Sequence, residues 1–304
     1  SDLCPSRPTA ESKLMWILFT LLAAFMQAWR NAFQKQLSVD VNVMGVTLAR
    51  FIYASPLAAL YLWILYREPS AQLPQFSGNF VFYVVAAALM QILATALMVV
   101  LFKQKNYAIG VGLAKSEAIF AAVLGVLFFA STLTPLGWLG VLVGSVAVFL
   151  LSGLTSFKTI SWPTVLIGSA SGLAFALTSL WVREASLALG LPFPYGAAWV
   201  LLFVISLQTL VLMVYLMLRD SATLVALWQR PRLTLLTSVT SCIGSLGWFT
   251  AMSLEIVPLV KTLGQVEVLF TLLISAFFFK EKLKKQDYLG LTLIVIAALL
   301  VMWA

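Results

Sequence analysis

The stretch LAKSEAIF at residues 113–120 returns as LGQVEVLF at residues 263–270, an offset of 150 residues that aligns Glu117 with Glu267. Two further pairs recur at this offset: Phe-Phe at 128–129 and 278–279, and Leu-Gly at 139–140 and 289–290. Apolar matches arise easily in so apolar a chain, whereas aligned glutamates do not. The sequence therefore predicts two related halves.

The composition predicts a membrane protein. The chain has 304 residues, of which 62% are hydrophobic and 10% are charged, while a soluble domain carries about 25% charged residues. The apolar residues fall into separate runs near the length of about 20 residues that a membrane helix needs. Runs such as 141–151 do not alternate, which excludes a transmembrane β-barrel.

Short turn sequences divide the chain into segments of spanning length, and no connection is long enough for a soluble domain. We expect ten transmembrane helices, near residues 14–35, 43–65, 80–102, 107–130, 135–152, 163–187, 195–218, 233–253, 257–279 and 286–304.

An odd number of spans in each half has a topological consequence. A second half that follows five spans starts on the opposite side of the membrane, so the halves are inverted. We therefore expect an all-α integral membrane fold of ten helices as two inverted five-helix repeats. The repeats would cover residues 13–153 and 154–304, behind a disordered tail at 1–12. Inverted repeats are typical of secondary transporters that bind substrate near the membrane midplane.

The second half also carries a local pattern: VEVLF at 266–270, FFKEKL at 278–283 and YLG at 288–290. It resembles the ten-helix EamA-type proteins of the drug/metabolite transporter superfamily, although Lys280 stands where that family often has Gly. The first half has ASTL at 130–133 and lacks the Glu of this pattern. The resemblance implies export of amino acids or other metabolites, or transport of nucleotide sugars or drugs. Amino-acid exporters of the YddG type are the nearest group.

Two carboxylates lie where a carboxylate is costly. Glu117 and Glu267 fall near the middle of the fourth and ninth segments, and a charge in the bilayer core marks a functional site by default. The pair either binds a cationic group or protons, or is a structural pair satisfied by a buried Lys or hydroxyl. Two nearby carboxylates resist joint ionisation, so proton coupling is one hypothesis.

Buried cations accompany the glutamates. Lys115 precedes Glu117 by two residues, and Lys261 stands one turn before Gln265. Each lysine is a candidate to neutralise the glutamate of the opposite half, or to meet a substrate carboxylate. A cavity of both signs would suit a zwitterion such as an amino acid, but four buried charges can also pair among themselves.

Polar residues of the third and eighth segments align as well. Gln91 and Thr95 correspond to Ser241 and Ser245, in each case spaced to share a helix face. They either line the cavity or form hydrogen bonds between helices. Trp248 lies two turns after Ser241 and is expected to form an aromatic wall.

Helix-loosening residues begin the fourth and ninth segments. Gly110, Gly112 and Pro258 are candidate hinges, although Gly and Pro are also ordinarily tolerated in transmembrane helices.

The net charge of +8 is interpreted as topological, because most Lys and Arg end apolar runs and can reach the headgroups. Arg30 and Arg50 are expected to be anchors of this kind, and no nucleic-acid partner is expected. The charge of the short loops favours external termini, whereas the resemblance implies internal ones, so the orientation stays open.

The sequence lacks the residue types and motifs that metal sites, disulfide frameworks and several kinds of enzyme need. With no histidine and only Cys4 and Cys242, a Cys/His metal site and a disulfide framework are excluded. The chain has no Walker motif and no serine-hydrolase or Gly-x-Gly-Asp motif, so we expect no enzyme, catalytic residue, metal or cofactor. We expect a multi-pass protein of a bacterial inner membrane, monomeric or weakly dimeric, whose partners are lipids and a small-molecule substrate. A flippase of lipid-linked headgroups and, less so, a membrane-embedded enzyme remain alternatives.

Overall fold

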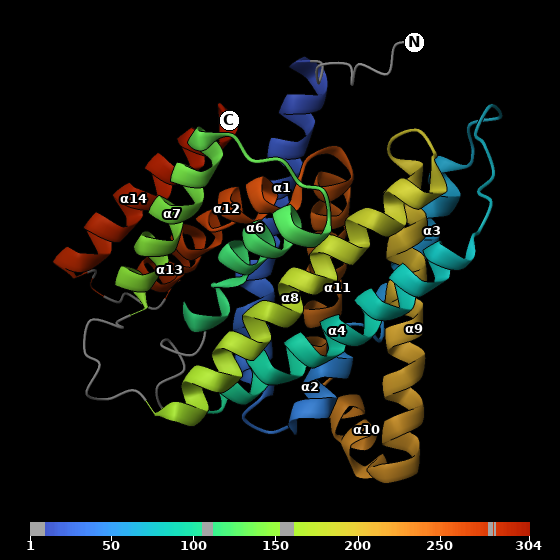
Figure 1. Cartoon of the computed structure of the whole chain (residues 1–304). Coiled ribbons are helices and arrows are strands. Elements are labelled where there is room, and N and C mark those ends of the chain that lie inside the picture. The colour runs from blue at the N-terminus through green and yellow to red at the C-terminus, as the bar shows by residue number, and fades with distance from the viewer. Residues whose placement is uncertain (1–9, 105–111, 153–160, 279–281, 283) are drawn as a thin grey trace.

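The computed structural model describes residues 10–104, 112–152, 161–278, 282 and 284–304 (Figure 1). All regular elements among these residues are helices: α1 (Ala10–Leu37), α2 (Val43–Ala49), α3 (Ala54–Leu65), α4 (Gly78–Phe102), α6 (Glu117–Phe128), α7 (Pro135–Leu151), α8 (Trp162–Leu189), α9 (Tyr195–Arg219), α10 (Ser221–Trp228), α11 (Pro231–Leu254), α12 (Val257–Leu263), α13 (Val266–Phe278) and α14 (Lys285–Met302). Helix α1 begins inside the predicted tail, whose residues 1–9 lie outside the described residues.

Polar caps set where the long helices begin. Ser77, Thr134 and Ser161 each accept a hydrogen bond from the backbone N–H three residues ahead, at the starts of α4, α7 and α8. Such caps satisfy N–H groups that the first helical turn leaves without partners. Pro135 follows its cap at the first helical position, where its missing N–H costs nothing. The loops that end the predicted segments therefore carry the start signals of the next helices.

Eight candidate membrane spans occur among the described residues, by length and apolar composition. Two of them are interrupted, since α2 with α3 forms one span (Val43–Leu65) and α12 with α13 forms another (Val257–Ile274). Helix α7 is apolar but shorter, at 17 residues. Helix α6 has 12 residues, and part of the fourth predicted segment lies outside the described ranges. The structure supports a multi-helix membrane fold, and the count of ten stays a prediction.

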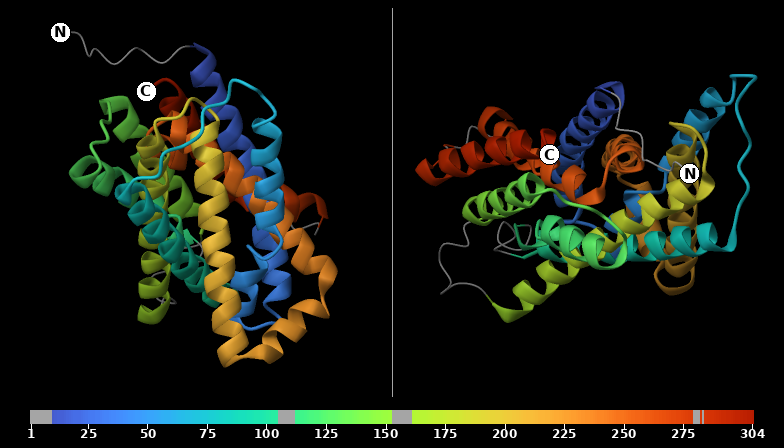
Figure 2. Two further views of the ribbon diagram at one scale, coloured as in Figure 1. Left: turned by 90° about the vertical axis from the view of Figure 1, so that its right-hand side faces the viewer. Right: turned by 45° about the horizontal axis from the view of Figure 1, so that its top comes forward.

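Helices from the two halves of the chain pack against each other throughout. The most extensive contacts join α1 with α11, α4 with α8, and α7 with α14. Figures 1 and 2 show each of these pairs running side by side. The offset of 150 residues carries α1 onto α8 and α11 onto α4, so the first two contacts are equivalent under the predicted repeat.

Glycines allow α7 and α14 to approach closely. A Cβ at Gly140 would collide with Val301, and a Cβ at Gly290 would collide with Leu151. These two contacts are also related by the 150-residue offset, because Gly140 corresponds to Gly290 and Leu151 to Val301. Small residues at such crossings let membrane helices pack through van der Waals contact.

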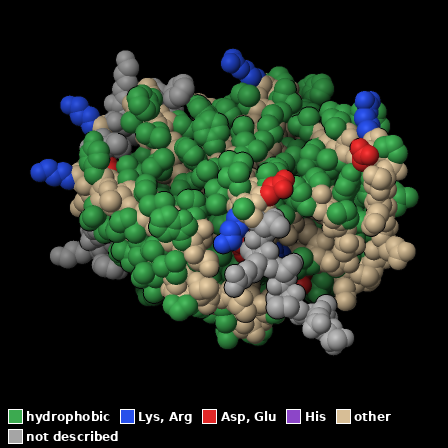
Figure 3. All heavy atoms as spheres, turned by 90° about the horizontal axis from the view of Figure 1, so that it is seen from above, with side chains coloured by type: hydrophobic (Ala, Val, Ile, Leu, Met, Phe, Trp, Pro, Cys, Tyr) green, Lys and Arg blue, Asp and Glu red, His purple; other side chains and the backbone are tan. Residues whose placement is uncertain are grey.

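The outer surface is apolar. Large side chains such as Leu18, Val81 and Leu210 are exposed on the long helices. The end of the bundle seen from above in Figure 3 shows hydrophobic side chains with Lys, Arg and acidic side chains among them. The start of α1 and the end of α14 lie at the same end of the bundle (Figure 2). A soluble protein rarely exposes so much contiguous apolar surface, so lipid is the solvent that this surface fits.

Three interruptions of helices occur deep in the bundle. Residues 50–53 separate α2 from α3, residues 115–116 precede α6, and residues 264–265 separate α12 from α13. At each interruption, backbone hydrogen bonds join residues three apart instead of the four of an α-helix. Examples are Phe51 N–H to Leu48 C=O and Glu267 N–H to Gly264 C=O.

The predicted hinge positions are not these interruptions. Gly112 lies in a short helical stretch before the break at 115–116, and Pro258 lies in the first turn of α12, where a proline is tolerated. Gly110 falls outside the described residues. Whether any of them acts as a hinge stays a prediction.

Candidate substrate site at the helix interruptions

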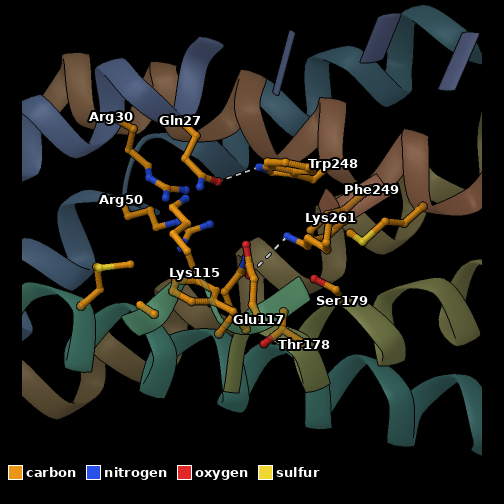
Figure 4. A pocket seen from close by; sticks show the side chains of 15 residues that line it. Gln27, Arg30, Arg50, Lys115, Glu117, Thr178, Ser179, Trp248, Phe249 and Lys261 are labelled. Carbon is orange, nitrogen blue, oxygen red and sulfur yellow. Dashed lines mark hydrogen bonds and ion pairs between the residues drawn. The ribbon is translucent and has the colours of Figure 1, made fainter. Parts of the chain in front are cut away.

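A small polar cavity lies where the interrupted helices meet. Its lining comes from α1, the break after α2, α4, the break before α6, α8, α11 and α12: Gln27, Arg30, Arg50, Gln91, Met98, Ala114, Lys115, Glu117, Phe175, Thr178, Ser179, Trp248, Phe249, Met252 and Lys261 (Figure 4). The free volume is about 20 Å³, which is room for about one water molecule. In this conformation the cavity is therefore too small to hold a metabolite.

The interruptions place both glutamates at helix N-termini. Glu117 is the first residue of α6, and Glu267 lies in the first turn of α13. The N-terminal end of a helix carries a partial positive charge that stabilises a carboxylate. Arg50 stands at the C-terminal end of α2, where a cation is favoured for the same reason. Each of these three buried charges thus lies at a helix end whose partial charge is opposite in sign.

Glu267 is held by three donors. Lys115 forms a very short ion pair with its Oε2, and Gln27 Nε2 donates to the same oxygen at 2.5 Å. Asn31 Nδ2 donates to Oε1 at 2.8 Å. Only 2% of Glu267 is exposed, so all of its compensation comes from protein groups.

Glu117 is held far more loosely. Among the described residues its one ion pair joins it to Lys261 Nζ, at 3.6 Å. The same ammonium group lies 4.1 Å from the centre of the Trp248 ring, a distance typical of a cation–π interaction. The Trp248 indole N–H in turn donates to Gln27 Oε1 at 2.8 Å. A chain of contacts therefore links Glu117 to Glu267 through Lys261, Trp248 and Gln27. Figure 4 shows this chain from Glu117 as far as Gln27.

The four charges predicted to lie together do so. Lys115 from the first half meets Glu267 from the second, and Lys261 from the second meets Glu117 from the first. This is the arrangement in which each lysine neutralises the opposite half's glutamate. It satisfies the charges mutually, and it also ties the two halves together at the cavity.

Two arginines expected at the membrane surface are instead buried at the cavity. Arg30 and Arg50 are 3% and 2% exposed. Arg50 donates from Nε to Ser241 Oγ at 3.0 Å and from an NH group to Thr95 Oγ1 at 2.6 Å. Arg30 donates to Asn31 Oδ1 at 3.1 Å. The interpretation of both as headgroup anchors is wrong, because helix packing places them inside the bundle, where hydroxyls and amides solvate them.

The remaining predicted polar residues divide between the cavity and its supports. Gln91 lines the cavity and accepts a hydrogen bond from Gln208 Nε2 at 2.6 Å. Thr95 and Ser241 hold Arg50 and do not line the cavity themselves. Ser245 is buried in α11 outside the lining.

Gln265 is also outside the cavity lining, packed against Gly144 of α7. It is 3% exposed, and neither atom of its amide has a hydrogen-bond partner among the described residues.

Sequence reasoning missed the polar face of α1. Gln27, Arg30, Asn31 and Gln34 follow the i, i+3, i+4, i+7 spacing that places residues on one side of a helix. Such a polar stripe in an apolar segment indicates a buried polar contact, although no single residue of the stripe does. Two residues of the stripe, Gln27 and Asn31, are among the three donors to Glu267.

The site has little resemblance to a divalent-metal site. No cluster of three or more His, Cys, Asp or Glu side chains occurs within the described ranges. Glu117 in the lining and the nearby Glu267 outside it each face a lysine, and Arg30 and Arg50 add two further cations. Such a lining is suited to polar or anionic groups.

Two stretches of the chain match models of known protein families. Residues 14–153 match the model of the EamA-like transporter family, and residues 227–304 match that of the magnesium transporter NIPA. Both matched stretches, 14–153 in the first half and 227–304 in the second, thus correspond to families of membrane transporters. The matches indicate a multi-pass transporter rather than an enzyme, and they support the EamA resemblance without confirming the YddG subtype.

A solved protein structure is similar to this protein over almost the whole chain. It has a TM-score of 0.69 and 15% sequence identity, and the alignment covers 97% of this chain and 99% of that one. At this identity the similarity establishes the fold alone. No curated protein sequence matches the chain.

Proposed function

We propose that this protein is a secondary transporter that moves small polar metabolites, amino acids or related compounds, by alternating access, most readily as an exporter in a bacterial inner membrane. The observation that carries the proposal is the small, charged cavity at three helix interruptions. Interrupted helices with charged ends are how transporters build substrate sites inside the hydrocarbon region. The absence of a Walker motif from the sequence argues against ATP as the energy source.

Two inverted repeats supply the proposed motion. The equivalent contacts of α1 with α11 and of α8 with α4 support such a repeat, as do the equivalent glycine contacts between α7 and α14. If each half exchanges its conformation with the other, an outward-open cavity becomes inward-open. The ion pairs of Lys115 with Glu267 and of Lys261 with Glu117 cross between the halves, so we propose that they stabilise the closed state between these two.

We assign the coupling role to Glu117 rather than Glu267. Glu117 lines the cavity and has one long ion pair, so a proton can replace Lys261 as its partner more readily than one could replace the three donors of Glu267. Glu267 has three donors within the protein and does not line the cavity. We therefore propose that only Glu117, and not both carboxylates, takes part in coupling.

Two other cargoes fit less well. The match of residues 227–304 to a magnesium transporter family raises Mg²⁺ as a cargo, but Mg²⁺ requires oxygen ligands in an octahedral arrangement and this cavity contains four cations. A flippase would need a cavity that opens sideways to lipid, whereas the described cavity has a free volume of only about 20 Å³ and is lined mainly by buried side chains. Soluble cargo is therefore favoured.

The test is counterflow of labelled amino acids and small carboxylates in proteoliposomes that contain the purified protein, at several pH values. We expect exchange by the wild type that changes with pH, and exchange that no longer changes with pH for Glu117→Gln. Glu68→Gln is the control, because Glu68 is exposed in the loop after α3. Full exchange with unchanged pH dependence in Glu117→Gln would remove this carboxylate from the mechanism, and no exchange of any compound would refute the transport function.

A further inference from the structure

Positive charge exceeds negative charge at the cavity. Six charged side chains are buried among the described residues: Arg30, Arg50, Lys115, Glu117, Lys261 and Glu267. Four are cations and two are carboxylates, which leaves two positive charges uncompensated. Each buried charge without a counter-charge costs several kcal/mol in a low-dielectric interior.

The uncompensated charge belongs to the two arginines. Each lysine lies within ion-pair distance of a glutamate, whereas Arg30 and Arg50 have no carboxylate within 4.0 Å in the described part of the chain. Neutral groups bond Arg50, namely Ser241 and Thr95. The Nε of Arg30 is buried and has no hydrogen-bond partner among the described residues. Both arginines line the cavity, and Figure 4 shows their guanidinium groups next to each other beside Gln27.

From this we infer that the transported compound carries a net negative charge and that Arg30 and Arg50 together bind its anionic group, a carboxylate or a phosphate. The guanidinium group is planar and presents paired N–H donors that match these anions. An anion placed between the two arginines would offset part of the excess charge and give the Arg30 Nε a partner. The inference rests on the proposed transport function and specifies its substrate class.

The rest of the lining indicates the body of the compound. Met98, Phe175, Trp248, Phe249 and Met252 supply apolar and aromatic surface around the polar centre. An amine on the substrate gains less here, because both glutamates already face lysines. The expected order of affinity is therefore organic anion, then zwitterion, then organic cation.

A ligand series with one body and different charges tests this order. The purified full-length protein is titrated with 3-phenylpropionate, phenyl phosphate, phenylalanine and phenethylamine, and with inorganic phosphate, with thermal stabilisation and tryptophan fluorescence as readouts. We expect 3-phenylpropionate or phenyl phosphate to bind at least about tenfold more tightly than phenethylamine, since hydrogen bonds between charged groups are the strongest that a protein offers a ligand. The comparison of the two organic anions separates a carboxylate site from a phosphate site.

Variants assign the effect to the arginines. We expect Arg30→Gln and Arg50→Gln each to weaken binding of the anion by about tenfold or more, again from the loss of charged hydrogen bonds. Arg50→Lys keeps the positive charge but loses the paired N–H donors of the guanidinium group. Its affinity for the anion is therefore expected to lie between those of the wild type and Arg50→Gln. This variant provides the test if the glutamine variants do not fold. Arg67→Gln is the control, because Arg67 is exposed and packs on Trp63.

Three results would overturn the inference: binding of phenethylamine as tight as that of the anions, no binding of either organic anion, or unchanged anion binding in both glutamine variants. Counterflow separates this failure from failure of the transport function. Rapid exchange of a cationic or neutral compound by the wild type would support the transport function and refute the anion site. Arginine-dependent anion binding without exchange of any compound would support the anion site and refute the transport function.

Discussion

The surroundings of Glu117 and Glu267 occupy equivalent places in the repeated sequence and differ in almost every contact. Both glutamates follow a helix interruption and sit at the start of the next helix. Glu267 accepts from Lys115, Gln27 and Asn31, whereas Glu117 has a single ion pair at 3.6 Å among the described residues. The backbone feature is shared, and the chemistry around it is not.

The difference arises because the partners of Glu267 are not repeated. At an offset of 150 residues, Lys115 corresponds to Gln265, Gln27 to Leu177 and Asn31 to Trp181. Helix α1 therefore carries a polar face that its counterpart α8 lacks. Glu267 is therefore held by several partners and Glu117 by one, and this asymmetry agrees with the coupling role proposed for Glu117.

The largest expected effect is the stability difference between Glu267→Gln and Glu117→Gln. Removing one partner of a buried ion pair costs about 3–5 kcal/mol, and Glu267→Gln leaves Lys115 buried without its anion. We expect its apparent melting temperature in detergent to fall by roughly 6–20 °C, on the scale of about 2–4 °C per kcal/mol that applies to domains of about 150–250 residues. Glu117→Gln should lose less than half as much, since Lys261 keeps its contact with the Trp248 ring. Equal losses would show that the two sites are equally structural.

Double-mutant cycles sharpen the same comparison. Replacement of Lys115 and Glu267 by Met, singly and together, should give a coupling of about 2 kcal/mol, because contacting residues in one network couple by about 0.5–3 kcal/mol. The cycle of Lys261 and Glu117 should give less than half of this coupling. Reversible unfolding of the purified protein, or the shift in apparent melting temperature where unfolding is irreversible, provides the measurement. A larger coupling for Lys261 with Glu117 would contradict the contrast between the glutamates.

A third prediction concerns a place where the halves should behave alike. Gly140→Ala and Gly290→Ala each introduce a methyl group into the α7–α14 contact, against Val301 and Leu151. Overpacking costs about 1–3 kcal/mol, so both variants should melt several degrees below the wild type and within about 3 °C of each other on the scale of about 2–4 °C per kcal/mol.

Gly78→Ala is the control for these variants, because a Cβ at Gly78 meets nothing within 4 Å. A large loss in one glycine variant and none in the other would argue that the α7–α14 contact is not symmetric. A comparable loss in Gly78→Ala would mean that the effect is not one of packing.

The charge pairs could be predicted from the sequence because they depend on local signals, whereas the repeat itself stays a prediction. Buried Glu and Lys stand out in apolar segments, and the cost of burying them predicts that they pair. The offset of 150 residues then identifies which residues are equivalent. The same reasoning placed Trp248 at the site, since its spacing from Ser241 fixes its helix face.

What the sequence does not specify is the depth at which a side chain lies. Arg30 and Arg50 lie near segment ends by sequence, yet α1 extends over 28 residues and the span containing Arg50 is interrupted at 50–53. Both features place the arginines inside the bundle. The helix interruptions were equally hidden, because 115–116 and 264–265 have no proline, and only Gly264 among them is a strong helix breaker. Tertiary packing decides such breaks.

The smallest expected effect tests the link between the two glutamates. Trp248→Phe keeps an aromatic face over Lys261 and removes the indole N–H that donates to Gln27 Oε1. A single hydrogen bond contributes about 0.5–1.5 kcal/mol, so the melting temperature should fall by only about 1–5 °C on the scale of about 2–4 °C per kcal/mol. Gln27 would then be free to rotate away from Glu267, so the pH dependence of counterflow should shift although Glu117 itself is unchanged. Trp303→Phe is the control, because Trp303 is 80% exposed. If Trp248→Phe left the pH dependence as in the wild type, the two carboxylates would act independently, and the contact chain through Gln27 would be structural alone.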